Sequence, residues 1–345
     1  MAAQAGSAFE GMTVDHTVFY VGDADRAAGE LVDKYGLAAL GTSETSSVRS
    51  VAVGGGTIRL VFTQAVTDDT PAAAYVKVHG DGVADIALGV ADARAAFAEA
   101  VRRGARPVAG PAVVDDAVVA TIMGFGDVVH TFVERPGGTP GGGPAPAGGL
   151  RLLDHFAVCL EAGRLAPTVE FYETVLDFRM VFEEKIVVGA QSMNSKVVQS
   201  TSGGVTLTLI EPDTSRKPGQ IDDFLKNHGG AGVQHIAFAT DGIVDSVRRL
   251  RARGVELLTT PAAYYDQLVD RLELTRYSAA ELAELDLLVD EDQDGKLYQI
   301  FARSTHPRGT FFFEIIERAG ARTFGSGNIK ALYQAVEAEH SRTAR

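Results

Sequence analysis

The sequence predicts an α+β fold in which a β-α-β-β-β module occurs twice in each half of the chain, with mostly antiparallel strands curved around a central space. The first observation behind this prediction is a pair of repeated strand-like segments. Residues 14–21 (VDHTVFYV) match residues 153–160 (LDHFAVCL), and residues 82–88 (GVADIAL) match residues 232–238 (GVQHIAF). The two halves should therefore form two open, barrel-like domains of the same design.

The second observation is a Gly/Pro-rich stretch between the two copies. Residues 136–149 (PGGTPGGGPAPAGG) contain no side chain able to anchor a core, which is typical of a flexible or extended linker. At 345 residues the chain is also long enough for two ordinary domains. We expect an N-terminal domain over residues 1–135, this linker, and a C-terminal domain over residues 150–345.

The elements between the repeated strands follow the same order in both halves. Each first strand precedes a helical pattern and then alternating apolar strands with glycine at the turns. Each second strand precedes a helix that ends at a glycine, where a left-handed cap is expected. The corresponding segments are residues 23–37 and 163–178, residues 50–64 and 195–212, and residues 92–105 and 241–255.

The second half contains an additional segment, residues 255–296, for which the first half shows no counterpart. It holds two short helical patterns and the acidic turn DEDQDG. This turn does not predict an EF-hand calcium site. A twelve-residue loop beginning at Asp290 would end at Phe301, where a bidentate carboxylate is required.

Composition excludes several classes of function. A net charge of −13 without a basic patch argues against nucleic acid as a partner. No apolar stretch approaches the roughly 20 residues that a membrane-spanning helix needs, and the N-terminus lacks the pattern of a secretory signal. Cys159 is the one cysteine, so neither an intramolecular disulfide nor a cysteine-rich zinc site can form. We expect a soluble, globular and cytoplasmic protein.

Three polar residues within apolar, strand-like runs predict a metal site. They are His155, His235 and Glu314. A buried glutamate among apolar neighbours needs a cation, a metal or a shifted pKa. Two imidazoles and one carboxylate suit ferrous iron in oxygen chemistry, although their spacing also leaves zinc and manganese open.

The first half does not repeat this set of ligands. At the matching positions it holds His16, Asp85 and Thr131. One of the three ligand types is therefore kept. This asymmetry predicts that the C-terminal domain performs the chemistry and the N-terminal domain supports it.

Three longer motifs carry a resemblance to a known family. HGGAGVQHIAF, LYQIFARSTHPRGTFFFEIIER and FGSGNIKALYQAVEAEH resemble the 4-hydroxyphenylpyruvate dioxygenase family, which has the vicinal oxygen chelate fold. The resemblance covers nearly the whole chain. It implies Fe(II) held by the three ligands named above, 4-hydroxyphenylpyruvate bound to the metal through its 2-oxo acid, O2 as the second substrate, and the homo-oligomers common in this family.

Departures from the family pattern bear on the product. Homogentisate-forming members carry Phe-Pro-Ile-Asn-Glu-Pro and Gly-Asn-Phe, where this chain reads LTLIEP and GNI. Thr208, Ile210 and Ile329 match instead the sister enzymes that hydroxylate the benzylic carbon to give 4-hydroxymandelate and CO2. We expect that reaction. The alternatives are a homogentisate-forming dioxygenase and a non-catalytic binding protein of the same fold.

The resemblance also implies the residues of the substrate pocket. The polar candidates are the amides of Gln299 and Gln220, Ser195, and Asn328 or Asn194. The aromatic candidates are Phe301 and Phe312. The last helix presents an apolar stripe of Ile329, Leu332, Tyr333 and Val336, which would cover the pocket and exclude water.

Overall fold

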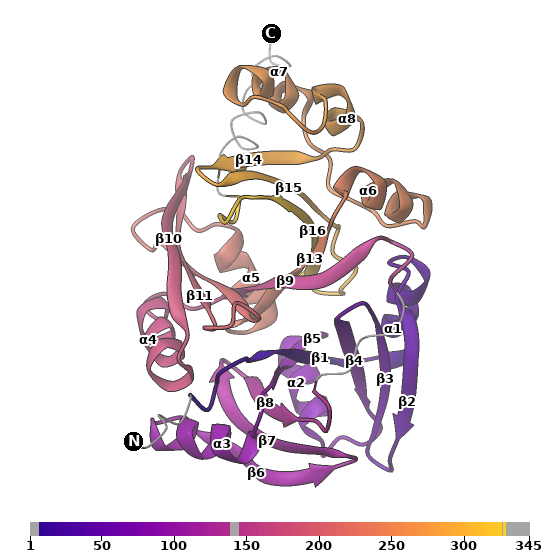
Figure 1. The fold of residues 1–345 in the computed structure, drawn as a ribbon, viewed down its shortest axis with the longest axis vertical. Coiled ribbons are helices and arrows are strands. Elements are labelled where there is room, and N and C mark those ends of the chain that lie inside the picture. Colours follow the sequence, from indigo (N-terminus) through magenta and orange to yellow (C-terminus); the bar gives the residue numbers. More distant parts are fainter. Residues whose placement is uncertain (1–6, 139–144, 326, 329–345) are drawn as a thin grey trace.

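Two eight-stranded sheets of identical topology make up the protein (Figure 1). The structure, a computed structural model, describes residues 7–138, 145–325 and 327–328. Each sheet follows the order predicted for two β-α-β-β-β modules, so the predicted α+β class and the duplication are confirmed. The second sheet curls around a central space (Figure 1). The metal-ligand candidates lie on its strands.

The first sheet contains, in spatial order, β2 (Ala38–Glu44), β3 (Val48–Gly55), β4 (Ile58–Ala65), β1 (Thr13–Val21), β5 (Gly82–Gly89), β8 (Val128–Glu134), β7 (Ala117–Phe125) and β6 (Pro107–Val114). Its helices are α1 (Ala24–Asp33), α2 (Pro71–His79) and α3 (Ala93–Arg102). The second sheet contains β10 (Arg179–Val188), β11 (Gln191–Gln199), β12 (Thr206–Pro212), β9 (Leu150–Cys159), β13 (Gly232–Thr240), β16 (Phe312–Ala319), β15 (Gly295–Phe301) and β14 (Leu288–Asp292). Its helices are α4 (Leu165–Leu176), α5 (Gln220–His228), α6 (Ile243–Ala252), α7 (Ala262–Arg271) and α8 (Ala279–Glu284).

The helices begin and end as their sequences predict. In α3, the side chain of Asp92 accepts a hydrogen bond from the backbone N–H of Ala95, which satisfies one of the free donors of the first turn. The chain leaves the helix through Gly104, whose φ of 108° favours glycine. Gly254 follows α6 in the same way, with a φ of 86°.

The additional segment of the second half is shorter than residues 255–296. Its helical part is confirmed as α7 and α8, and the acidic turn joins β14 to β15. However, β14 occupies the same edge position in the second sheet that β6 occupies in the first. It is therefore the counterpart of β6, and sequence comparison missed it because the two strands share no residue pattern.

Part of the Gly/Pro-rich stretch is packed rather than extended. The N–H of Ala147 donates to the carbonyl of Gly36 at 3.1 Å, and Pro146 and Gly148 are buried. A Cβ on Gly148 would lie 2.6 Å from the carbonyl oxygen of Tyr35, so only glycine fits this close approach. The end of the stretch thus lies against the end of α1.

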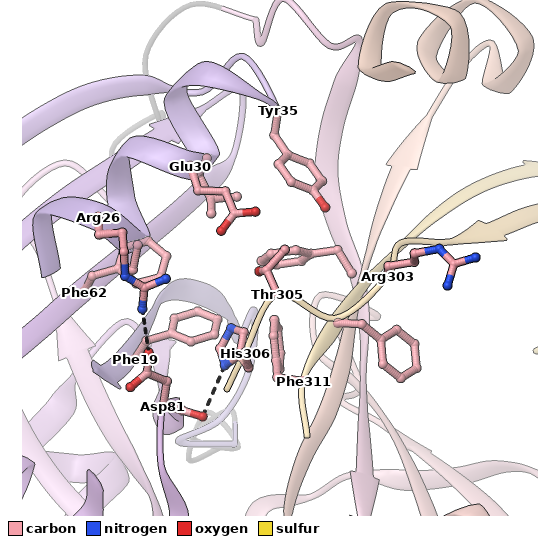
Figure 2. A pocket seen from close by; sticks show the side chains of 14 residues that line it. Phe19, Arg26, Glu30, Tyr35, Phe62, Asp81, Arg303, Thr305, His306 and Phe311 are labelled. Atoms are coloured by element: carbon pink, nitrogen blue, oxygen red, sulfur yellow. Dashed lines mark hydrogen bonds and ion pairs between the residues drawn. The ribbon is translucent and has the colours of Figure 1, made fainter. Parts of the chain in front are cut away.

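A loop of the second half docks on the first half. Figure 2 shows His306 and Phe311 of this loop beside Phe19 and Asp81. The imidazole of His306 donates from Nδ1 to the carbonyl of Asp81 at 3.3 Å, and Phe311 contacts Phe19 edge to face at 5.2 Å. This loop leads directly into β16, so the first half supports the strand that carries Glu314.

None of the helices in the described part of the chain combines the length and the hydropathy that a membrane span requires.

Candidate metal centre

The three candidate ligands stand on adjacent central strands and face the same side of the second sheet. Ala237 of β13 pairs with His155 of β9 on one side and with Glu314 of β16 on the other. His235 precedes Ala237 by two residues, and side chains two apart share one face of a strand. The strand register therefore makes the three side chains converge.

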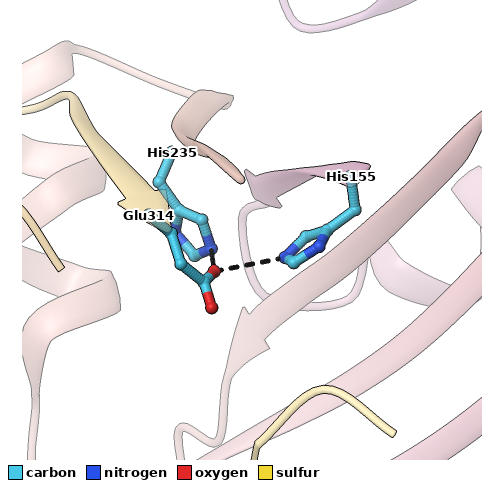
Figure 3. A group of neighbouring side chains, drawn as sticks. All are labelled: His155, His235 and Glu314. Carbon is cyan, nitrogen blue, oxygen red and sulfur yellow. Dashed lines mark ion pairs between the residues drawn. The ribbon is translucent and has the colours of Figure 1, made fainter. Parts of the chain in front are cut away.

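Their donor atoms are close enough for one metal ion. Nε2 of His235 lies 3.3 Å from Oε2 of Glu314, and Nε2 of His155 lies 3.5 Å from the same oxygen (Figure 3). All three donor atoms lie within 4.8 Å of one another. Neighbouring ligands of an octahedral ion with bonds of about 2.1 Å stand roughly 3 Å apart, so two nitrogens and one oxygen at these distances fit a divalent metal.

Burial gives the set its chemical character. Glu314 is 2% exposed and His155 is 3% exposed. A carboxylate at this depth requires a cation or strong hydrogen-bond donors. Burial lowers the pKa of His235, which favours the neutral imidazole that a metal needs.

A second layer of residues orients His155. Nδ1 of His155 donates to Asp154 at 2.8 Å, so Nε2 carries the lone pair directed at the centre. Arg318 donates two hydrogen bonds of 2.8 Å to the same carboxylate. Burial alone would raise the pKa of Asp154, but the hydrogen bonds from His155 and Arg318 hold it well below its usual range. Sequence reasoning missed both residues, although the Asp-His and Glu-Arg pairs recur in both halves.

The first half keeps the equivalent aspartate, histidine and arginine, but two of its three ligand positions hold residues that bond to each other. Asp15 accepts from His16 at 2.6 Å and receives two hydrogen bonds of 2.9 Å from Arg135. Where the second half has His235 and Glu314, Asp85 instead accepts from the N–H of Thr131 at 3.0 Å and from the Thr131 hydroxyl. Burial raises the pKa of Asp85 to about 6. The carboxylate is thus satisfied by a neighbouring residue and has no need of a metal.

Aromatic rings enclose the two histidines. Phe312 stacks on His235 with ring centroids 4.9 Å apart, and Phe301 meets the same imidazole edge to face at 6.1 Å. Phe324 meets His155 edge to face at 5.2 Å. This phenylalanine belongs to the FGSGN motif, but nothing in the sequence alone marked it as a neighbour of the metal ligands.

Ser195, Thr208 and Ile210 share the face of the sheet that carries the ligands. Thr208 pairs with Ala157, two residues after His155, and Ile210 pairs with Ser195. All three are buried. Among the described residues, the hydroxyl of Thr208 has no hydrogen-bond partner, which leaves a polar atom free to meet a ligand or a water.

The remaining candidates divide into two groups. Gln299 is 2% exposed and pairs with Ile316, two residues beyond Glu314 on the same face, and Asn328 donates to it at 3.0 Å. In contrast, Gln220 is exposed at the start of α5, and Asn194 points to the face opposite Ser195. The structure therefore does not bring Gln220 and Asn194 to the ligands. The candidates Ile329 and Tyr333 lie outside the described residues.

A cavity of about 1170 Å³ lies beside the residues that support His155, and its lining among the described residues includes none of the three ligands. It borders Asp154, Arg318 and Phe324, which contact His155 or its support, and the first half contributes residues 57–59 to its wall. A cavity of this size can admit a ligand with one aromatic ring.

Comparison with known proteins gives the family. Residues 10–141 match the model described as hydroxyphenylpyruvate dioxygenase, N-terminal, and residues 152–299 match the glyoxalase/bleomycin resistance protein/dioxygenase superfamily. The 4-hydroxyphenylpyruvate dioxygenase of Dictyostelium discoideum is 35% identical, over 94% of this chain and 96% of the relative. The chain belongs to the 4-hydroxyphenylpyruvate dioxygenase family. It is therefore an enzyme of the dioxygenase type with the vicinal oxygen chelate fold.

Other members of the family extend the comparison. The 4-hydroxyphenylpyruvate dioxygenase of Yarrowia lipolytica is 32% identical, over 95% of this chain and 92% of the relative. Among solved structures, a triple mutant of 4-hydroxymandelate synthase from Streptomyces coelicolor is 44% identical and superposes with a TM-score of 0.85, covering 95% of this chain and 98% of that one. The family thus includes relatives named for two different reactions.

Proposed function

We propose that the enzyme uses Fe(II) to convert 4-hydroxyphenylpyruvate and O2 into 4-hydroxymandelate and CO2. The donor set of two imidazoles and one carboxylate suits ferrous iron with coordination positions left open. The 44% identity to a 4-hydroxymandelate synthase also supports the proposal. The single observation that carries it is the apolar side chain of Ile210 on the ligand-bearing face of the second sheet.

Ile210 belongs to an apolar group in the interior of the second half. It packs with other buried residues, namely Ala157, Cys159, Ile186, Met193, Ile221 and Phe224. An asparagine at this position would offer a donor and an acceptor to the substrate ring. Isoleucine offers neither, so packing alone would hold the ring there.

Ferrous iron, when bound, supplies a site where the 2-oxo acid and O2 react together. His155, His235 and Glu314 would hold it. The substrate would bind beside these residues through the carboxylate and keto oxygens of its 2-oxo acid. Phe301 and Phe312 would enclose the reacting carbons and exclude water.

The position of the substrate decides between two products. One atom of O2 enters the carboxylate formed as CO2 leaves, and the other enters either the benzylic carbon or the ring. A displacement of about 1 Å can change a rate by roughly a hundredfold. A pocket without the asparagine amide can therefore favour oxygen insertion at the benzylic carbon over insertion at the ring, with few other substitutions.

The test is incubation of the Fe(II)-loaded protein with 4-hydroxyphenylpyruvate and O2, with oxygen uptake recorded and products separated by chromatography. We expect 4-hydroxymandelate in a one-to-one ratio with the O2 consumed. The names of the curated relatives favour a second candidate, the homogentisate-forming dioxygenase. Homogentisate as the main product would establish it, and absence of O2 uptake would indicate a binding protein.

A further inference from the structure

One hydroxyl of the inserted helix α7, that of Tyr264, is linked to Gln299 through Asn328. Tyr264 is 2% exposed, and four polar groups surround its oxygen. Arg271 Nη2 lies at 3.1 Å, the Val289 N–H at 2.8 Å, the Val289 carbonyl at 3.1 Å and Asn328 Oδ1 at 2.8 Å. The first half has no helix equivalent to α7 among its described residues, so this arrangement belongs to the half that carries the metal ligands.

The chemistry of these groups fixes the direction of each hydrogen bond. A guanidinium and a backbone N–H can only donate, so the oxygen of Tyr264 accepts from Arg271 and from Val289. Its single proton is then available for one acceptor. Oδ1 of Asn328 lies closer than the carbonyl of Val289, and we assign the proton to the Asn328 oxygen.

The same direction continues to Gln299. Because Oδ1 of Asn328 faces Tyr264, its Nδ2 faces the other way and donates to Oε1 of Gln299 at 3.0 Å. Both amides are buried, with Asn328 at 0% and Gln299 at 2% exposed. The chain of donors that begins at Arg271 therefore ends on the oxygen of Gln299, which leaves the Nε2 group as the part of this amide that can donate to a ligand.

Neighbouring glycines hold this orientation. A Cβ on Gly325, where φ is 77°, would overlap Oε1 of Gln299. The N–H of Gly327 donates to Asp290 at 2.9 Å, and a Cβ there would overlap that carboxylate. Gly325 thus fits directly on Gln299, and Gly327 fits directly on Asp290 of β14.

The position of Gln299 relative to the ligands indicates which part of the substrate it meets. Phe301 pairs with Glu314, and Gln299 lies two residues away on the same face. Two residues of a strand span about 6.6 Å. A group displaced by that length from Glu314 is suited to the end of the substrate opposite its 2-oxo acid, where the phenol oxygen lies.

We propose that Tyr264 and Arg271 are positioning residues that present the N–H of Gln299 to the phenol oxygen of the substrate. This inference rests on the proposed function, because it takes 4-hydroxyphenylpyruvate as the ligand. It gives α7 a role in substrate selection, and it predicts that Gln299 acts as a donor rather than as an acceptor.

The test compares two ligands that differ only in the phenol oxygen. Dissociation constants of 4-hydroxyphenylpyruvate and phenylpyruvate are measured by calorimetry on the Fe(II)-loaded protein without O2. In Tyr264→Phe, binding of 4-hydroxyphenylpyruvate should weaken about tenfold, the value of one hydrogen bond, while binding of phenylpyruvate changes less than about twofold. Tyr265→Phe is the matched control. It removes a hydroxyl of the same helix that lies outside the chain of donors, and the ligand preference should remain.

A second pair of variants tests the direction of the chain. Arg271→Lys keeps a donor and should retain the preference for 4-hydroxyphenylpyruvate, whereas Arg271→Met should lose it. Equal weakening of both ligands would show a merely structural role and overturn the inference, as would an unchanged preference in Tyr264→Phe. Tight binding of both ligands to the wild type with no preference would overturn the inference and leave the metal site intact. Binding of neither would refute the proposed function itself, and the inference with it.

Discussion

Asp154 accepts a hydrogen bond from Nδ1 of His155 at 2.8 Å, and this bond directs Nε2 of the imidazole toward Glu314. Such a partner fixes the tautomer of a ligating histidine and makes it a stronger base. The equivalent pair in the first half, Asp15 and His16, is 2.6 Å apart but supports no set of ligands. A substitution at Asp154 can therefore be compared with the same substitution at Asp15, which has the same hydrogen bonds but lies outside the metal site.

Asp154→Asn should weaken Fe(II) binding by about 10- to 100-fold, because an amide can no longer accept from both His155 and Arg318 as a carboxylate does. Anaerobic calorimetric titration with ferrous ion measures the effect. Asp15→Asn is the control, and its affinity for Fe(II) should equal that of the wild type. Equal loss in both variants would mean that the carboxylates act through overall stability.

His235→Ala should abolish tight Fe(II) binding, because it removes one of three protein ligands. Iron retained after anaerobic gel filtration, expressed per protein chain, measures the occupancy. His16→Ala removes a histidine from the corresponding sheet of the first half and should retain full occupancy. Full activity of His235→Ala would exclude that residue from the site.

Ile210→Asn should shift part of the product from 4-hydroxymandelate to homogentisate, because the amide can hold the ring in a different position. The ratio of the two products, separated by chromatography, should change by about tenfold, the effect of one hydrogen bond on relative barriers. Ile210→Val is the control for a change of packing without a polar group. An unchanged ratio in Ile210→Asn would show that this position only fills space.

Ile329→Phe tests the other departure from the homogentisate-forming pattern. An added aromatic wall should slow benzylic hydroxylation or shift the product, because less space remains for the ring to tilt. Rate and product ratio are measured together. The same rate and the same ratio as the wild type would assign the residue to packing alone.

The duplication explains why much of the fold was predictable. Matching strands in the two halves predicted the module and its order, and the contrast of His235 with Asp85 singled out the ligands. Pairing between distant strands does not appear in a single sequence. For this reason β14 was not recognised as the counterpart of β6.

Site residues were predictable where burial conflicted with polarity and less so elsewhere. Glu314 stood out because a carboxylate in an apolar run requires a partner. Gln220 was predicted from resemblance alone and is exposed. Several of its sequence neighbours are charged, so no conflict between burial and polarity supported that prediction. Tyr264 gave no signal, because a tyrosine in an amphipathic helix is ordinarily a packing residue. Its role depends on hydrogen bonds to residues far along the chain.

Two buried histidines predict a loss of stability in mild acid. Burial lowers the pKa of both His130 and His228 from 6.5 to about 4. The unfolded chain therefore takes up protons between pH 6.5 and 4 that the folded chain does not, and stability falls as the pH falls through this range. Each histidine should cost about 2 kcal/mol of unfolding free energy at pH 5 relative to pH 7.

His130→Gln isolates one of these contributions. Nδ1 of His130 donates to the carbonyl of Ile86 at 3.1 Å, and Nε2 accepts from the Tyr172 hydroxyl at 2.7 Å. Glutamine can make both bonds but does not titrate. Urea unfolding at pH 7 and pH 5 should show a difference about 2 kcal/mol smaller in the variant. The same difference in both proteins would contradict this assignment.

We propose that the second oxygen atom of O2 enters the benzylic carbon of the substrate. The most direct test is turnover of 4-hydroxyphenylpyruvate by the Fe(II)-loaded enzyme under 18O2, followed by mass spectrometry of the product. We expect 4-hydroxymandelate with one labelled oxygen in the benzylic hydroxyl and one in the carboxylate. A product labelled on the ring would contradict this proposal.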